Sequence, residues 1–140
     1  MNNKYTAIIA IDFDGTIVTH DYPKIGMDLP YAKEIIKALI DEGHKVFIYT
    51  MRDGDELEDV VKYCETNELN VCGFNRSPSQ FSQSPKQYAH VYIDDAALGC
   101  PLDNDLEISN RPFVNWFAVG RKLVAEGFLP HTKYHEIITS

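Results

Sequence analysis

The chain has 140 residues, of which 44% are hydrophobic and 24% charged, and its formal net charge is -8. This length is that of one domain, so we predict a single domain over residues 1–140. The ordinary hydrophobic content excludes wholesale disorder. The acidic balance argues against a general nucleic-acid binder, because such proteins neutralise phosphates with an excess of lysine and arginine.

Signals for membranes or secretion are weak in this sequence. No segment approaches the roughly 20 apolar residues that span a bilayer. The N-terminal stretch differs from a signal peptide, because its apolar part is short and runs directly into acidic residues. Cys64, Cys72 and Cys100 form neither a close-spaced metal pattern nor a complete set of disulfides. These features predict a cytoplasmic protein with no membrane partner.

The first half of the chain alternates between strand-like and helix-like segments. A buried strand is predicted at residues 7–11, followed by a helix from about Pro30 to Gly43 with Asp28 as its cap. A second strand at residues 46–49 leads into a second helix. The apolar stripe of that helix consists of Leu57, Val60, Val61 and Cys64.

The second half continues the alternation with a longer polar interruption. A third strand is predicted at residues 71–74, a Ser/Pro/Gln-rich loop at 75–85 and a fourth strand at 91–93. A helix follows over residues 112–127, while the pattern of residues 128–140 is ambiguous. The whole succession predicts an α/β fold, a three-layer Rossmann-like parallel sheet with helices on both faces.

Two acidic pairs directly follow predicted strands. Asp12 and Asp14 come after the first strand, and Asp94 and Asp95 come after the fourth. Ligands bind at the carboxyl ends of the strands in open parallel sheets, so we expect both pairs to converge in one crevice. Carboxylates this close repel one another, so the site needs a cation, a shared proton or both. The pattern favours a metal site.

Four short motifs, in this order, resemble the haloacid dehalogenase superfamily of phosphotransferases. Residues 12–16 (Asp-Phe-Asp-Gly-Thr) match the first motif, residues 48–50 the second, Lys86 the third and residues 93–95 the fourth. More narrowly, residues 50–54 (Thr-Met-Arg-Asp-Gly) are similar to those of small capless hydrolases of bacteria and phage. The resemblance covers nearly the whole chain.

The resemblance implies a Mg2+-dependent phosphomonoester hydrolase with an aspartyl-phosphate intermediate. It makes Asp12 the nucleophile and Asp14 the acid and base of the two proton transfers. Thr50 and Lys86 would contact the phosphoryl oxygens. The expected Mg2+ ligands are Asp12, the carbonyl of Asp14, and Asp94 or Asp95, and the choice between the last two stays open.

Further candidates concern the phosphate and the rest of the substrate. Gly15 and Thr16 offer backbone amides, and Arg52 and Arg76 offer guanidinium groups for an anionic substrate. Simpler interpretations stand beside these. Either arginine could pair with a surface acid, and Thr50 could cap the helix that follows it. An Asp-x-Asp-Gly sequence alone also occurs in turns and calcium loops.

The gaps between the motifs are too short for a cap domain. Only a short loop separates Gly15 from Pro30, and it carries His20, a candidate for the site entrance. The stretch 75–85 is equally modest. We therefore expect an open site that acts on a small phosphate ester such as a nucleotide or sugar phosphate, with a homo-oligomer as one way to close it. The alternatives are a phosphatase of polynucleotide ends or phosphoproteins, and a non-catalytic phosphate-binding protein of the same fold.

Overall fold

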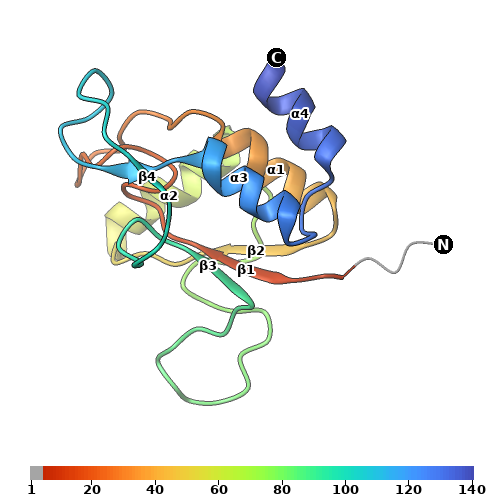
Figure 1. Cartoon of the computed structure of the whole chain (residues 1–140). Helices are drawn as coiled ribbons and strands as arrows, with labels where there is room; N and C mark the ends of the chain where they lie inside the picture. The colour runs from red at the N-terminus through yellow and green to blue at the C-terminus, as the bar shows by residue number, and fades with distance from the viewer. Residues whose placement is uncertain (1–4) are drawn as a thin grey trace.

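The computed structural model describes residues 5–140, so residues 1–4 of the predicted domain and of the N-terminal stretch lie outside the described residues. A parallel sheet in the order β2-β1-β3 forms its centre (Figure 1). Its strands are β1 (Ile8–Ile11), β2 (Lys45–Ile48) and β3 (Val91–Ile93). The register sets Ile11 beside both Ile48 and Ile93, so the three strands end side by side.

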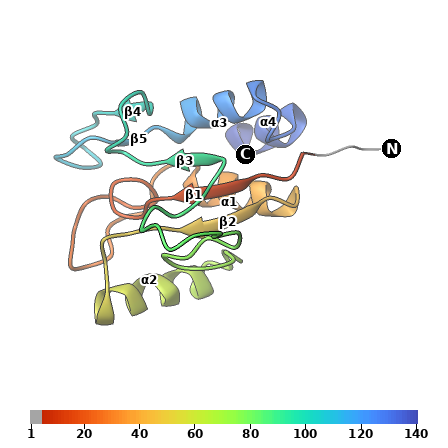
Figure 2. The same cartoon turned by 90° about the horizontal axis from the view of Figure 1, so that it is seen from below.

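Four helices and a small hairpin complete the described fold. The helices are α1 (Ala32–Asp41), α2 (Gly54–Thr66), α3 (Trp116–Ala125) and α4 (His131–Thr139). The hairpin pairs β4 (Leu102–Asp103) with β5 (Phe113–Val114) in antiparallel fashion. Figure 2 shows α2 near the β2 edge of the sheet and the packed pair α3 and α4 toward the β3 edge.

The main core lies between the sheet and the helices. All four residues of β1 are buried, as expected for a strand with both faces covered. On the helical face, Ile9 and Ile11 join one apolar cluster with residues of all four helices. Phe13, just beyond β1, is fully buried and packs edge-on against Tyr63 of α2, with 5.3 Å between ring centroids. This packing anchors the residues that follow β1.

The opposite face of the sheet is covered by a loop. Ile8, Ala10 and Phe47 form a second apolar cluster with Ala89, and Tyr88 packs against it. In Figure 1 the helices lie on one side of the sheet and the segment between α2 and β3 on the other. The prediction of helices on both faces is therefore corrected for the described residues, because the Ser/Pro/Gln-rich composition of this segment does not support a helix. The α/β class, the parallel sheet and, over residues 5–140, the absence of a cap domain are confirmed.

The predicted third strand at residues 71–74 is wrong in detail. The segment does run beside β2, since Cys72 N donates to Val46 O and Ile48 N to Gly73 O. It forms only one isolated parallel bridge, between Ile48 and Phe74, and the chain then turns at Asn75, whose φ is 53°. An irregular edge therefore replaces a regular fourth strand.

The helix boundaries also shift from those predicted. The first helix begins at Ala32 after Tyr31, and Asp28 instead forms an ion pair with Lys33 and accepts a hydrogen bond from Tyr63. The helix predicted from Pro112 begins at Trp116, because the residues before it pair in the hairpin. Asn115 caps this helix by accepting from the backbone N of its third residue.

The ambiguous tail becomes α4, which packs against α1 and α3. Within residues 5–140, none of the helices has the length and apolar character needed to cross a membrane.

Candidate active site

Three carboxylates meet where the parallel strands end. Asp12 follows β1, and Asp94 and Asp95 follow β3. Each offers one oxygen atom, and the three oxygens lie within 4.8 Å of one another. The in-register pairing of β1 with β3 produces this proximity, because it aligns the last residues of the two strands. A cluster of three half-buried carboxylates is the kind of donor set that a hard cation such as Mg2+ prefers.

Thr16 connects two of the three acids. Its hydroxyl donates to Asp12 Oδ2 at 2.9 Å, and its oxygen accepts from the backbone N of Asp95 at 3.2 Å. The side chain is fully buried, and the Thr16 carbonyl accepts from the indole N–H of Trp116. Thr16 therefore orients Asp12 relative to the loop after β3.

His20 holds Asp95 from the other side. His20 Nε2 lies 2.8 Å from Asp95 Oδ2. The ring packs directly over Gly15, where the Cβ of any other residue would overlap both His20 and the Asp95 carboxylate. Gly15 also has a φ of +80°, a conformation that disfavours other residues. A side chain at this position would therefore strain the turn and displace His20 or Asp95.

The pKa of Asp12 is raised by burial and, to a smaller extent, by the neighbouring acids. Burial raises this pKa from its ordinary value of 3.8 to about 8, with further contributions from repulsion by Asp94 and from hydrogen bonding with Asp95. Charge on Asp12 is therefore costly until a positive charge enters the cluster. This electrostatic state fits a bound cation, and the ligands on offer are the oxygens of Asp12, Asp94 and Asp95.

Tyr49 supports the third acid. Its hydroxyl donates to Asp94 Oδ2 at 2.9 Å, and burial together with this bond raises the pKa of Tyr49. The Tyr49 ring meets that of Tyr92 edge-on at 6.0 Å. Lys86 Nζ in turn lies 5.6 Å from the centroid of the Tyr92 ring. Lys86 is exposed, and among residues 5–140 it forms no ion pair with the acids. The rings of Tyr92 and Tyr49 lie between Lys86 and Asp94.

Asp14 points to a different partner from that of Asp12. Arg52 Nε donates to Asp14 Oδ2 at 2.7 Å, and Arg52 Nη2 donates to Asp14 Oδ1 at 2.8 Å. Arg52 is buried, with 2% of its surface exposed. The guanidinium group of Arg52 therefore faces Asp14 and not the solvent. This position differs from the predicted contact between Arg52 and an anionic substrate.

Thr50 lies at the end of β2, as predicted, but its polar atoms are engaged locally. Its Oγ1 accepts from the backbone N of Arg52 at 3.1 Å. Its own N donates to Asn75 Oδ1 at 2.7 Å. The structure therefore links Thr50 to the turn after β2, and α2 itself begins only at Gly54.

The remaining substrate candidates receive less support from their surroundings. The backbone amides of Gly15 and Thr16 donate within their own turn, to Val18 O and Phe13 O. Arg76 is exposed, and among residues 5–140 its side chain forms no ion pair. Because the backbone amides of Gly15 and Thr16 are already hydrogen-bonded, neither is free to bind a phosphate oxygen.

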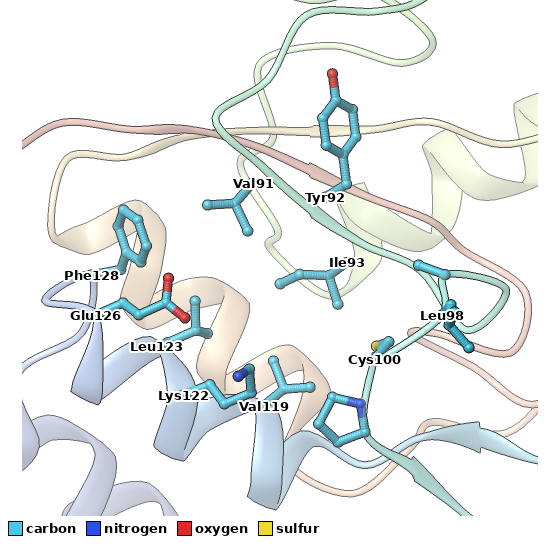
Figure 3. A pocket seen from close by; sticks show the side chains of 13 residues that line it. Val91, Tyr92, Ile93, Leu98, Cys100, Val119, Lys122, Leu123, Glu126 and Phe128 are labelled. Carbon is cyan, nitrogen blue, oxygen red and sulfur yellow. The ribbon is translucent and has the colours of Figure 1, made fainter.

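An apolar cavity of about 230 Å3 lies beside β3 rather than at the acids (Figure 3). Its walls come from β3, from the loop after it and from α3, with Ile93, Cys100 and Leu123 among them. The three clustered carboxylates are not part of its lining. The cavity is therefore separate from the candidate active site.

Residues 9–76 match the family model of the haloacid dehalogenase-like hydrolases. A solved structure of a conserved protein from Bacteroides thetaiotaomicron is also similar, with 30% sequence identity and a TM-score of 0.69. The match covers 87% of this chain and 92% of that one. The chain belongs to the haloacid dehalogenase-like hydrolase family. A comparison with curated proteins finds no match.

Membership of the haloacid dehalogenase-like family accounts for the acidic cluster and supports hydrolase activity. Two side chains, Tyr49 and His20, contact the acidic cluster although the sequence did not predict these contacts. From the sequence, Tyr49 is interpreted as the last residue of an apolar strand. Its hydroxyl group is the one signal that it could bind a polar partner such as Asp94. His20 is predicted only to line the entrance of the site. It is separated from Asp95 by 75 positions in the sequence, and no sequence pattern indicates that the two side chains meet.

Proposed function

We propose that this protein is a Mg2+-dependent phosphomonoester hydrolase that forms an aspartyl-phosphate on Asp12. The observation that carries the proposal is the cluster of Asp12, Asp94 and Asp95, with one oxygen of each within 4.8 Å of the others. The family supports hydrolysis, and the raised pKa of Asp12 supports a cation in the cluster. Bound Mg2+ would neutralise charge on these carboxylates and on the phosphate.

In the first half of the reaction, an Asp12 carboxylate oxygen attacks phosphorus. The bond between phosphorus and the ester oxygen breaks, and that oxygen takes a proton from Asp14 as the alcohol leaves. Thr16 keeps the Asp12 carboxylate oriented through its hydroxyl. We assign Thr50 and Lys86 to the phosphoryl oxygens, where a compact donor and a positive charge stabilise the transition state.

In the second half, water attacks the phosphorus of the aspartyl-phosphate. Asp14 takes the proton of that water, and the bond between phosphorus and Asp12 breaks. The products are inorganic phosphate and the free Asp12 carboxylate. Splitting the hydrolysis in this way replaces one difficult displacement by two easier ones.

A small phosphate ester is the proposed substrate class. The described fold has no cap domain, and the net charge of the chain is -8. This charge disfavours long polyanions such as nucleic acids, which bind through many basic contacts. A nucleotide or a sugar phosphate fits these conditions.

The test is a panel of phosphate esters assayed with and without Mg2+. The panel includes a mononucleotide, a hexose phosphate, 4-nitrophenyl phosphate, an oligonucleotide with a 5′-phosphate and a phosphoserine peptide. We expect Mg2+-dependent release of phosphate from the small esters and background rates for the Asp12→Asn variant. Asn preserves the shape of the side chain but cannot act as the nucleophile.

Rates that ignore both Mg2+ and Asp12→Asn would contradict the proposal. Preference for the oligonucleotide or the peptide would retain the mechanism and overturn the substrate class. Binding of phosphate esters without any turnover would support a non-catalytic protein of this fold.

A further inference from the structure

Every hydrogen-bond donor of the Arg52 guanidinium has an acceptor. The group carries five N–H bonds in a fixed planar arrangement. Two of them bind the carboxylate of Asp14, from Nε at 2.7 Å and from Nη2 at 2.8 Å. The others bind backbone carbonyls: Nη2 donates to Lys24 O at 2.7 Å, and Nη1 donates to Pro23 O at 3.0 Å and Glu56 O at 3.4 Å. The side chain is thus saturated by the protein itself.

The surroundings of Arg52 are those of an internal structural contact. The residue is only 2% exposed, and its Cζ lies 5.6 Å from the Phe13 ring centroid and 5.0 Å from that of Tyr22. The hydrogen bonds with Asp14 are the main cause of a raised pKa of Arg52. A buried, bidentate pair between arginine and a carboxylate is far more ordered than a surface ion pair.

Arg52 joins three separate segments at this point. Asp14 belongs to the turn after β1, residues 23–24 to the loop that follows it, and Glu56 to the first turn of α2. Asp14 keeps 18% of its side chain exposed, whereas the Arg52 side chain keeps 1%. The carboxylate therefore has an accessible side away from the arginine. Any other orientation of this carboxylate would leave N–H groups of a buried cation unpaired, which is costly.

We propose that Arg52 is the positioning residue for Asp14, and that it sets the orientation in which this carboxylate meets the ester oxygen of the substrate. The inference rests on the proposed function, in which Asp14 exchanges protons with the leaving group and with water. Arg52 acts through Asp14 and through the loop at residues 23–24, and it does not contact the substrate.

The role of a positioned acid depends on the leaving group. An alkyl alcohol leaves phosphorus as a poor anion unless it is protonated, whereas 4-nitrophenolate leaves without a proton. A change that misplaces Asp14 therefore slows alkyl esters more than 4-nitrophenyl phosphate. A change that only loosens the fold slows both esters alike.

The experiment compares wild type with Arg52→Lys, Arg52→Met and Asp14→Asn on 4-nitrophenyl phosphate and on the best alkyl phosphate. General acid catalysis contributes roughly 100-fold or more, so Arg52→Met should lower kcat on the alkyl ester by about 100-fold and on the aryl ester by less than about 10-fold. KM should stay within about 3-fold of wild type, because the substrate does not touch Arg52. Arg52→Lys should fall between wild type and Arg52→Met, since lysine restores the charge without the bidentate contact.

Asp14→Asn should show the same dependence on the leaving group. Arg121→Met, a substitution of an exposed arginine on α3, is the matched control and should change neither ester. Melting temperatures and circular dichroism of all variants report the folded fraction. If Arg52→Met does not fold, the Arg52→Lys variant carries the comparison.

Equal losses of kcat on both esters would overturn the positioning role. A rise in KM with unchanged kcat would overturn it as well, because it would make Arg52 a direct substrate contact. Absence of turnover by the wild-type protein on both esters with Mg2+ is a different result, and it would refute the proposed function on which the inference depends.

Discussion

The hydroxyl of Tyr49 donates a hydrogen bond to Asp94 Oδ2 at 2.9 Å, and this bond ties the end of β2 to the loop after β3. The other oxygen of Asp94 accepts from the backbone N of Ala96 at 2.9 Å. Asp94 is therefore oriented from two sides before any cation binds. Partners of this kind fix the direction of a metal ligand and raise the affinity of the site.

Replacement of Tyr49 by Phe should weaken Mg2+ binding. Loss of a hydrogen bond that orients a ligand usually lowers metal affinity by about 10-fold to 100-fold, and we expect a value in this range. Isothermal titration calorimetry with Mg2+ measures the effect. Tyr88→Phe is the control, because the Tyr88 hydroxyl forms its hydrogen bond with the ring of His90 and not with an acid of the cluster. Equal affinities of Tyr49→Phe and wild type would show that Asp94 needs no such support.

The raised pKa of Asp12 predicts that the metal-free protein loses stability as pH rises. Unfolded Asp12 titrates near pH 3.8, whereas folded Asp12 titrates near pH 8. Between these values folded Asp12 keeps a proton that the unfolded chain has released. The folded state then binds more protons than the unfolded state, so the free energy of unfolding decreases with increasing pH across this window.

Thermal unfolding in the presence of a chelator tests this dependence from about pH 5 to about pH 8. The melting temperature of wild type should fall by several degrees relative to that of Asp12→Asn, whose amide does not titrate. Parallel curves for the two proteins would contradict the raised pKa.

Mg2+ binding should release a proton near neutral pH. Folded Asp12 is largely protonated below its pKa of about 8, and a ligating carboxylate must be ionised. At pH 7 we therefore expect release of about one proton for each Mg2+ bound. Calorimetric titrations in buffers of different ionisation enthalpy give this number directly. Release by Asp12→Asn should be close to zero, and the same release by both proteins would assign the proton to another group.

Gly15→Ala should reduce both stability and activity. A Cβ at this position meets the His20 ring and the Asp95 carboxylate, and the φ of +80° adds backbone strain of about 1–2 kcal/mol. The clash should separate His20 from Asp95 and so disturb the acidic cluster. Gly127→Ala is a matched control, since Gly127 has a φ of +84° with no atom within 4 Å of the added Cβ.

Chemical denaturation measures the free energy of unfolding, and a Mg2+ titration measures the affinity of the acidic cluster. Together they distinguish backbone strain from the clash of the added Cβ with His20 and Asp95. The control should lose stability alone, while Gly15→Ala should lose more stability and also bind Mg2+ more weakly. If the two variants have the same stability and the same Mg2+ affinity, the contact with His20 and Asp95 has no importance.

Gly120→Ala should destabilise the packing of α4. A Cβ on Gly120 would lie 2.5 Å from the Tyr134 ring and 3.0 Å from Ile35 Cδ1. Overpacking of this kind costs about 1–3 kcal/mol, which exceeds the gain of about 1 kcal/mol from alanine in a helix. Urea denaturation shows whether the substitution lowers or raises the free energy of unfolding. A stabilised Gly120→Ala variant would show that α4 shifts easily away from α3.

Some relations in the site follow directly from the order of residues along the chain. An uninterrupted apolar run followed by Asp12 and another followed by Asp94 and Asp95 predict buried parallel strands with acids at their ends. The pairing register then brings these acids together, as observed. In contrast, the segment at residues 71–74 does not form the regular strand that was predicted. Its apolar pattern was correct, but the left-handed turn at Asn75 ends the segment, and beside β2 it forms only the isolated bridge between Ile48 and Phe74.

The pairing of Asp14 with Arg52 is beyond prediction from the sequence. The sequence allows Arg52 a substrate anion or a surface acid, and its chain distance of 38 residues from Asp14 favours neither partner. Burial decides the matter, because a guanidinium removed from water requires acceptors for all five donors. Three of those acceptors are backbone carbonyls, which have no signature in the side-chain sequence.

The α/β class and the convergence of Asp12 with Asp94 and Asp95 were predictable from the sequence. Strand-like and helix-like segments alternate along the chain, and parallel strands place the residues that follow them at one edge of the sheet. The packed structure alone sets the partners of those acids: Thr16 for Asp12, His20 for Asp95 and Tyr49 for Asp94. It also decided that Asp14 faces Arg52. Such contacts depend on the directions of individual side chains and on turns between distant segments, and these emerge only when the whole core packs.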